Sequence, residues 1–238
     1  MPQASFQVAI DGPVAAGKGT VSRLVAEKLG FLYVDTGAMY RATALLGERA
    51  GVAWDNEAEL VKLIDKAKIE MRNPNNGEKD GRLTTLLIDG EDVSWKIRTE
   101  KMSWGASSVA VLPKVRSALV KKQQEIARSQ EVIMEGRDIT YRVLPQADLK
   151  IYLTASDAVR AKRRQLQMQT RGINADFETV YSELLKRDKQ DMERASDPLK
   201  IVPEAWILDT SELSVEEAVV MIVEKVMSLR GKTDESGK

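Results

Sequence analysis

The sequence predicts an α/β fold in which helices cover both faces of a largely parallel sheet. Short apolar runs bounded by turn residues recur along the chain and alternate with longer segments of helical period. This alternation is typical of right-handed strand–helix–strand crossovers. The chain has 238 residues, of which 43% are hydrophobic, and can bury a sizeable core. Length alone therefore favours either one large domain or a core that carries a smaller insert.

The elements follow from these patterns in chain order. The last helix has a marked start, because Ser214 precedes Glu217 by three residues, which is the capping-box spacing. Five strands are expected at residues 6–10, 31–34, 132–134, 149–154 and 205–208. Helices are expected at residues 18–29, 38–50, 115–128, 156–169, 177–194 and 215–229.

Residues 57–105 break this rhythm. A helical stretch at 57–71 leads into the turn-rich residues 73–77, and a short strand follows at 83–88. Because long structureless loops are uncommon in compact domains, we interpret this segment as an inserted lobe rather than a surface excursion. The core domain is then expected at 1–56 and 106–230. The small, polar and charged residues 231–238 are expected to form a disordered tail.

Composition excludes several function classes. The 36 Lys and Arg residues balance 36 Asp and Glu residues, so no net charge draws the chain to nucleic acid or to an anionic membrane. The chain has no Cys and no His, which removes thiol chemistry and the commonest general base. The first residues lack a signal-peptide pattern, so we expect a cytoplasmic protein that binds neither nucleic acid nor membrane.

The strongest local signal is a glycine-containing loop between the first strand and the first helix. Small residues let successive backbone N–H groups converge on phosphate oxygens, and the following helix N-terminus and Lys18 add positive potential. An ordinary strand-to-helix turn with a solvated Lys18 is the alternative, which the strand before and the helix after the loop disfavour. The hydroxyl expected to reach Mg²⁺ is that of Thr20, one residue later than in the general pattern. The predicted loop is Gly12, Pro13, Val14, Ala15, Ala16, Gly17, Lys18, Gly19 and Thr20.

Arginines and carboxylates follow the ends of other strands. Parallel strands place their carboxyl ends at one edge of a sheet, where open α/β folds bind ligands. Each arginine by itself is compatible with a solvated surface charge, and Arg187 with Asp191 is compatible with simple pairing along a helix. Together they suit phosphoryl transfer, because guanidinium groups neutralise the charge spread over a transferring phosphoryl group. The candidates are Asp35, Arg41, Arg137, Asp138, Arg160, Arg163, Arg164, Arg187, Asp191 and Arg194.

These motifs resemble those of bacterial cytidylate kinases, in the nucleoside monophosphate kinase group. The resemblance rests on IDGPVAAGKGT, YVDTGAMYRA, SSVAVLPKVR, EGRDI, LKIYLTAS followed by RAKRR, and RDKQDMERASDPL. These segments span residues 8–209, nearly the whole chain. The glycine loop alone indicates a nucleotide kinase, whereas the other segments together are more selective for the cytidylate branch.

The resemblance implies a three-layer P-loop kinase with a mostly parallel five-stranded sheet, an inserted lobe that binds the acceptor nucleotide, and a lid at about 156–194. It also implies transfer of the terminal phosphate of ATP to CMP or dCMP with Mg²⁺. Lys18, Arg137 and Arg160 would be catalytic, and Arg160 and Arg164 would bind ATP with the loop. Acceptor binding would involve Asp35, Thr36 and Tyr40, with Arg41, Arg137 and Arg194 on its phosphate, Ser107, Arg116 and Asp138 on the base, and Arg187 with Asp191 on the sugar.

The chain departs from the family pattern at two places. Ala15 stands where a glycine is usual, so the loop backbone must there accommodate a Cβ. Residues 140–143 read Thr-Tyr-Arg-Val where Gly-Thr-Val-Val is common, and Arg142 could contact an anion or face solvent. The alternatives to a CMP kinase are a kinase for UMP or AMP and a nucleotide-binding regulator without turnover. No association signal is visible, so we expect a monomer.

Overall fold

The protein is built around a five-stranded parallel sheet. The computed structural model describes residues 5–78, 80–170 and 172–236, without the side chains of 232–236. The strand order is β2-β6-β1-β7-β8, and every neighbouring pair is parallel. The strands are β1 (Gln7–Asp11), β2 (Leu32–Asp35), β6 (Val132–Gly136), β7 (Leu149–Thr154) and β8 (Trp206–Asp209). All five predicted strands are therefore present, within one or two residues at each end.

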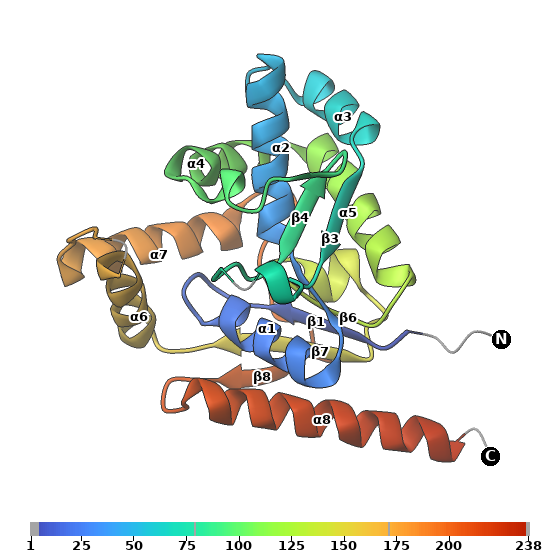
Figure 1. Ribbon diagram of the computed structural model, residues 1–238. Helices are drawn as coiled ribbons and strands as arrows, with labels where there is room; N and C mark the ends of the chain where they lie inside the picture. The colour runs from blue at the N-terminus through green and yellow to red at the C-terminus, as the bar shows by residue number, and fades with distance from the viewer. Residues whose placement is uncertain (1–4, 79, 171, 237–238) are drawn as a thin grey trace.

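Helices form the two outer layers, as Figure 1 shows. Helices α1 (Lys18–Leu29) and α8 (Val215–Ser236) cover one face, and α2 (Thr36–Ala50) and α5 (Pro113–Arg128) lie on the other. Helices α6 (Asp157–Gln169) and α7 (Phe177–Glu193) project from the body as an arm, drawn at the left of Figure 1. Helix α8 continues past residue 231, where the sequence predicts a disordered tail. Extending an existing helix requires no new nucleation, and residues 237–238 lie outside the described chain.

The segment predicted as a lobe contains α3 (Glu57–Lys66) and a small antiparallel sheet of β3 (Ile69–Arg72), β4 (Thr85–Ile88) and β5 (Glu91–Asp92). The predicted helix at 57–71 is too long: its last residues form β3, which alternates buried and half-buried side chains. Helix α4 (Glu100–Val109), which the sequence analysis does not predict, packs against α2. Thr99 caps its start by accepting a hydrogen bond from the Met102 amide.

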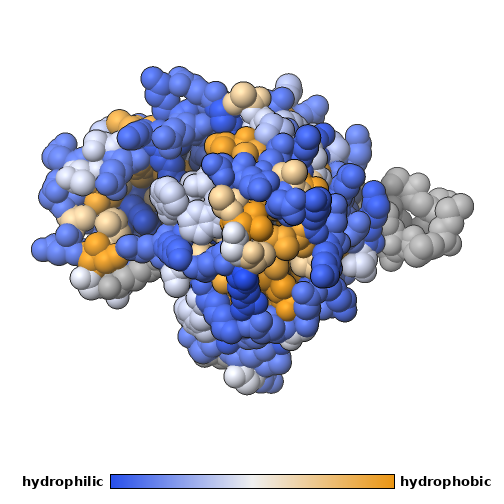
Figure 2. All heavy atoms as spheres, turned by 90° about the horizontal axis from the view of Figure 1, so that it is seen from above, coloured by the Kyte–Doolittle hydropathy of each residue, from blue (hydrophilic) through white to orange (hydrophobic). Residues whose placement is uncertain are grey.

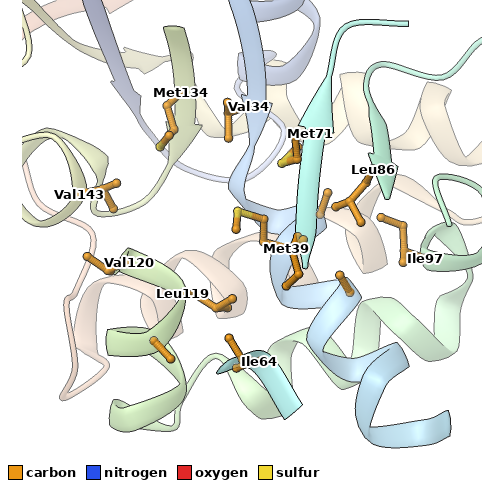
Figure 3. Close-up of a cluster of buried hydrophobic side chains, with 14 of the residues drawn as sticks. Val34, Met39, Ile64, Met71, Leu86, Ile97, Leu119, Val120, Met134 and Val143 are labelled. Carbon is orange, nitrogen blue, oxygen red and sulfur yellow. The ribbon is translucent and has the colours of Figure 1, made fainter. Parts of the chain in front are cut away.

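The buried apolar side chains described for the segment predicted as a lobe belong to the core of the main domain. Met71 of β3 and Leu86 of β4 belong to the same buried cluster as Met39 of α2 and Leu119 of α5 (Figure 3). A second cluster lies between the sheet and the helices α1 and α8. The insert is therefore held to the large domain by apolar packing as well as by the chain connections.

No helix within the three described stretches combines the length and the apolar character needed to cross a membrane.

Candidate active site

The loop between β1 and α1 is shaped by its glycines. A Cβ on Gly12 would lie 2.0 Å from the carbonyl oxygen of Leu153, so only glycine lets β7 approach the loop this closely. Ala15 has φ 57° and Gly17 has φ 91°, both in the left-handed region. Gly17 provides no side-chain cap for α1, so the amides of its first turn keep their capacity to bind an anion. The departure at Ala15 thus places a Cβ where glycine would be unstrained, at a cost of about 1 kcal/mol.

Lys18 lies beneath this loop with its side chain buried. Its Nζ donates to the carbonyl oxygens of Gly12 and Pro13, both at 2.8 Å. Burial and the nearby positive charge of Arg137 lower the pKa of Lys18 to about 7, although Glu135 acts in the opposite direction. Lys18 and Arg137 therefore lie within electrostatic reach of each other, although they follow different strands.

Asp35 ends β2 and holds two cations. Its Oδ1 accepts a hydrogen bond from the Ala38 amide and caps α2, while its Oδ2 pairs with Arg98 at 2.9 Å and with Arg41 at 3.8 Å. Burial favours the neutral acid, but Arg98 and Arg41 outweigh it and lower the pKa of Asp35. Arg98 comes from the inserted segment and brings it to the sheet edge.

The segment after β6 is held by a buried carboxylate. Asp11, at the end of β1, accepts hydrogen bonds from the Ile139 and Thr140 amides, each at 2.9 Å, and from the Thr140 hydroxyl at 2.7 Å. Residues 139–143 form a single π turn there, which explains how the unusual Thr140-Tyr141-Arg142 sequence is accommodated. The Arg142 side chain is half-exposed and pairs with Asp197 at 3.5 Å.

Asp138 lies between two arginines, just before this turn. It pairs with Arg116, whose side chain is 2% exposed, and lies 3.9 Å from Arg194. Burial raises the pKa of Asp138, against the effect of both cations. Arg116 also pairs with Asp197 at 2.9 Å and lies over the ring of Tyr40, 5.6 Å from its centroid.

Helix α7 completes this cluster from the arm. Asp191 pairs with the Nε of Arg137 at 2.6 Å and with Arg194 at 3.9 Å, so it joins the end of α7 to the end of β6. Arg187, one turn earlier on α7, is exposed and lies within electrostatic reach of Arg137, Asp191 and Arg41. Figure 2 shows hydrophilic atoms where the arm meets the body.

The arginines of α6 have two different surroundings. Arg160 is 3% exposed and donates to protein acceptors on all sides, including the Val14 carbonyl oxygen at 2.9 Å and the Asp188 carboxylate at 2.6 Å. Arg163 donates to the Thr210 carbonyl oxygen at 2.7 Å, and Arg164 to the Gln167 side chain. An ATP contact through Arg160 would have to replace some of these bonds.

A pocket of about 350 Å³ opens beside the glycine loop. Its walls come from the loop, from α6 and from the connection between β8 and α8. Five predicted ATP-binding residues line it, namely Ala15, Ala16, Gly17, Thr20 and Arg164. Thr210, Leu213 and Ser214 also line it.

The comparisons with known proteins agree with this geometry. The family model described as cytidylate kinase matches residues 8–228. The chain belongs to the cytidylate kinase family. It is 42% identical to a cytidylate kinase of Caldicellulosiruptor bescii over 92% of this chain and 94% of that protein. It is 43% identical to a cytidylate kinase of Symbiobacterium thermophilum over 91% of this chain and 93% of that protein.

One solved structure supports the fold alone. An uncharacterized protein from Eubacterium ventriosum covers 94% of this chain and 99% of its own, with a TM-score of 0.51 and 12% identity. At that identity the likeness concerns the arrangement of strands and helices. The predicted α/β fold with a parallel five-stranded sheet is confirmed by the strand order, and the predicted family is confirmed by the family model and the relatives.

Several of the predicted site residues converge, and others stand apart. Lys18, Arg41, Arg137 and Arg194 all lie at the carboxyl edge of the sheet, within the network around Asp35, Asp138 and Asp191. Thr36 is buried, and its hydroxyl donates to the Glu135 carbonyl oxygen at 2.7 Å. Ser107 is exposed on α4 and donates to the Ser103 carbonyl oxygen, so its role in base reading stays a prediction.

Sequence reasoning missed five side chains of the site. Arg98 lies in a short 3₁₀ helix of the insert, and Asp197 lies in a turn with φ 49°, a conformation that Asp tolerates. Glu135 accepts a hydrogen bond from the Tyr33 hydroxyl at 2.7 Å, and burial raises its pKa. Asp11 and Asp188 are buried with full sets of partners. Asp11, Glu135, Asp188 and Asp197 stand inside motifs quoted above without being singled out there, whereas no quoted motif contains Arg98.

Proposed function

We propose that this protein transfers the terminal phosphoryl group of ATP to CMP or dCMP, with Mg²⁺ accompanying ATP. Membership of the cytidylate kinase family makes it a phosphotransferase acting on CMP. The observation that carries the site assignment is the convergence of Lys18 with the arginine network. Arg137 lies close enough to lower the pKa of Lys18 and pairs with Asp191 at 2.6 Å.

ATP is assigned to the glycine loop and the adjoining pocket. The α1 N-terminus and Lys18 present positive potential to its phosphates, and the pocket between α6 and the β8–α8 connection is of a size suited to a nucleoside. Lys18 would exchange its bonds to two loop carbonyl oxygens for bonds to phosphate oxygens. Those bonds keep the side chain in place until ATP arrives.

The donor set fits a Mg²⁺ ion held mainly by the nucleotide. In the described part of the chain no three acidic side chains are placed to hold a metal, and the Thr20 residue is exposed beside the loop. Mg²⁺ commonly takes few protein ligands and keeps phosphate oxygens and waters instead. The Thr20 hydroxyl would be a ligand, and the Glu135 carboxylate, whose charge raises the pKa of Lys18, is an acidic group of the same neighbourhood. When bound, Mg²⁺ neutralises charge on the phosphates.

CMP is assigned to the network of arginines and carboxylates around Asp138 and Asp191. The exocyclic amine of cytosine is a donor, and the Asp138 carboxylate, fixed by Arg116, is an acceptor suited to it. Uracil offers an acceptor at that position and would leave a buried polar group unpaired. The acceptor phosphate would meet Arg41, Arg137 and Arg194, and the sugar would lie near Arg187 and Asp191.

The chain's contribution to catalysis is positioning and charge. Arg137 and Lys18 lie within electrostatic reach of each other, so both would stabilise charge on a phosphoryl group transferred between them. The α6–α7 arm, proposed as the lid, would exclude water from that group.

A coupled assay of ADP release with CMP, dCMP, UMP and AMP tests the proposal. We expect the highest kcat/KM with CMP or dCMP. A higher kcat/KM with UMP or AMP would show that this nucleotide, and not CMP, is the acceptor. ATP binding without any turnover would indicate a nucleotide-binding regulator. Lys18→Ala should abolish turnover while the protein stays folded by circular dichroism. A near-normal rate would remove Lys18 from the mechanism.

Three further expectations stay proposals. The insert is proposed as the acceptor lobe and the protein as a cytoplasmic monomer. Sedimentation equilibrium at several protein concentrations tests the oligomeric state, and a concentration-dependent mass would contradict it.

A further inference from the structure

The α6–α7 arm holds one residue of the glycine loop, Val14, through both of its backbone polar groups, which belong to two successive peptide bonds. The Val14 amide donates to Oδ1 of Asp188 at 3.2 Å, and the Val14 carbonyl oxygen accepts from NH1 of Arg160 at 2.9 Å. The same NH1 lies 2.6 Å from Oδ2 of Asp188, which closes a ring through the three residues. Arg160 belongs to α6 and Asp188 to α7, so both helices of the arm take part.

Both charged side chains are removed from water. The exposed fraction of each side chain is 4%. Arg160 is further fixed by bonds from Nε to the Ala155 carbonyl oxygen at 3.1 Å and from NH2 to Asp157 at 2.6 Å. A buried, charge-assisted contact of this kind has a defined geometry, and removing one partner leaves the other buried without compensation.

The ring also sets the direction of the next amide. The Val14 carbonyl and the Ala15 N–H belong to one planar trans peptide and point in opposite directions. Because Arg160 holds the carbonyl, the Ala15 N–H points away from the Arg160 side chain. Ala15 lines the pocket assigned to ATP, whereas Arg160 and Asp188 line a different pocket of about 340 Å³ on the far side of the loop.

We propose that Asp188, acting through Arg160, is a positioning residue that keeps the Val14–Ala15 peptide turned so that the Ala15 amide donates to a phosphate oxygen of ATP. The proposal rests on the assignment of ATP to the glycine loop. Asp188 touches no nucleotide in this arrangement. It would couple the position of the arm to the shape of the loop, because the ring forms only when both helices are docked against Val14.

The test is the affinity of Asp188→Ala, Asp188→Asn and Arg160→Lys for ATP with Mg²⁺, measured by titration calorimetry in the absence of CMP. Without the Asp188 carboxylate, the Val14 amide loses its acceptor and Arg160 loses its charged partner, so the loop peptide is no longer held in one orientation and we expect Asp188→Ala to weaken ATP binding about 10-fold or more. Asp188→Asn keeps the volume and one acceptor for the Val14 amide and should restore part of the affinity. The matched control is Lys189→Ala, an exposed neighbour on α7, which should bind ATP like the wild-type protein.

Kinetics separate this role from general support of the fold. In steady-state assays the KM for ATP should rise in the Asp188 variants, while the KM for CMP stays within about twofold of wild type. Equal rises for both nucleotides, or unchanged ATP binding in a folded variant, would overturn the proposal. Should Asp188→Ala fail to fold, the ATP affinity and the two KM values of Asp188→Asn and Arg160→Lys test the proposal by the same criteria. A wild-type protein that binds ATP but does not phosphorylate CMP would overturn the proposed activity and leave the binding test intact.

Discussion

Replacing Lys18 with Met should remove a rise in stability with pH that we expect of the wild-type protein between pH 7 and pH 9. Lys18 has a pKa of about 7 in the folded protein, because of burial and of Arg137, against 10.5 ordinarily. Between these values the unfolded chain keeps a proton that the folded protein has released. Since the unfolded state then binds more protons, the free energy of unfolding increases with pH.

The magnitude follows from the two pKa values. Integrating the difference in bound protons from pH 7 to pH 9 gives an increase of about 2 kcal/mol in the free energy of unfolding. The Met side chain has a similar volume and no titratable group, so the Lys18→Met variant lacks this contribution. The buried tyrosines, whose pKa values are raised, titrate above this window.

Urea denaturation at pH 7, 8 and 9, followed by far-UV circular dichroism, measures the effect in both proteins. The stability of the Met variant should exceed that of the wild type most at pH 7, and the difference should shrink as the pH rises. A difference that stays constant from pH 7 to pH 9 would show that Lys18 keeps its proton in the folded protein, and the reasoning would fail.

Three further substitutions test the site. Asp138→Ala should reduce the preference for CMP over UMP about 10-fold or more in steady-state assays, because the acceptor for the cytosine amine is lost; equal losses for both would contradict base reading. Gly12→Ala should raise the KM for ATP about 10-fold, because its Cβ would meet a β7 carbonyl oxygen at 2.0 Å, while Gly77→Ala, which has no such contact, should not; an unchanged KM would mean that the loop shape does not matter. Arg116→Ala should lower the free energy of unfolding by about 3 kcal/mol in urea, against less than about 1 kcal/mol for the half-exposed Arg142→Ala; equal effects would refute the importance of burial.

Local sequence patterns were sufficient to predict the strands of the large sheet and the helices that cover it. Each strand of the large sheet is a short apolar run bounded by turns, and each predicted helix has a clear periodicity, so the parallel sheet follows from the alternation. The helix predicted at 57–71 was too long because four residues of β3 are too few to separate a period of two from a helical period. Strand β5 has only two exposed residues and gives no signal at all.

Site residues were predictable from the sequence where a charged side chain comes shortly after the end of a predicted strand. Arg137 and Asp138 come directly after β6, and Arg41 lies one turn into the helix after β2. Which distant segments would meet was not predictable, because a motif that contains a carboxylate does not say which loop folding brings to it. Asp188 is the clearest case, since its contact with Val14 spans 174 positions of the chain.

The absence of a boundary between the insert and the large domain limits how this protein can be altered. Side chains of β3 and β4 interlock with those of α2 and α5, so the insert is no interchangeable module. Grafting residues 57–105 from a relative would require the facing surfaces of both helices to be transplanted with it, and evolutionary change on one side of this contact must be matched on the other.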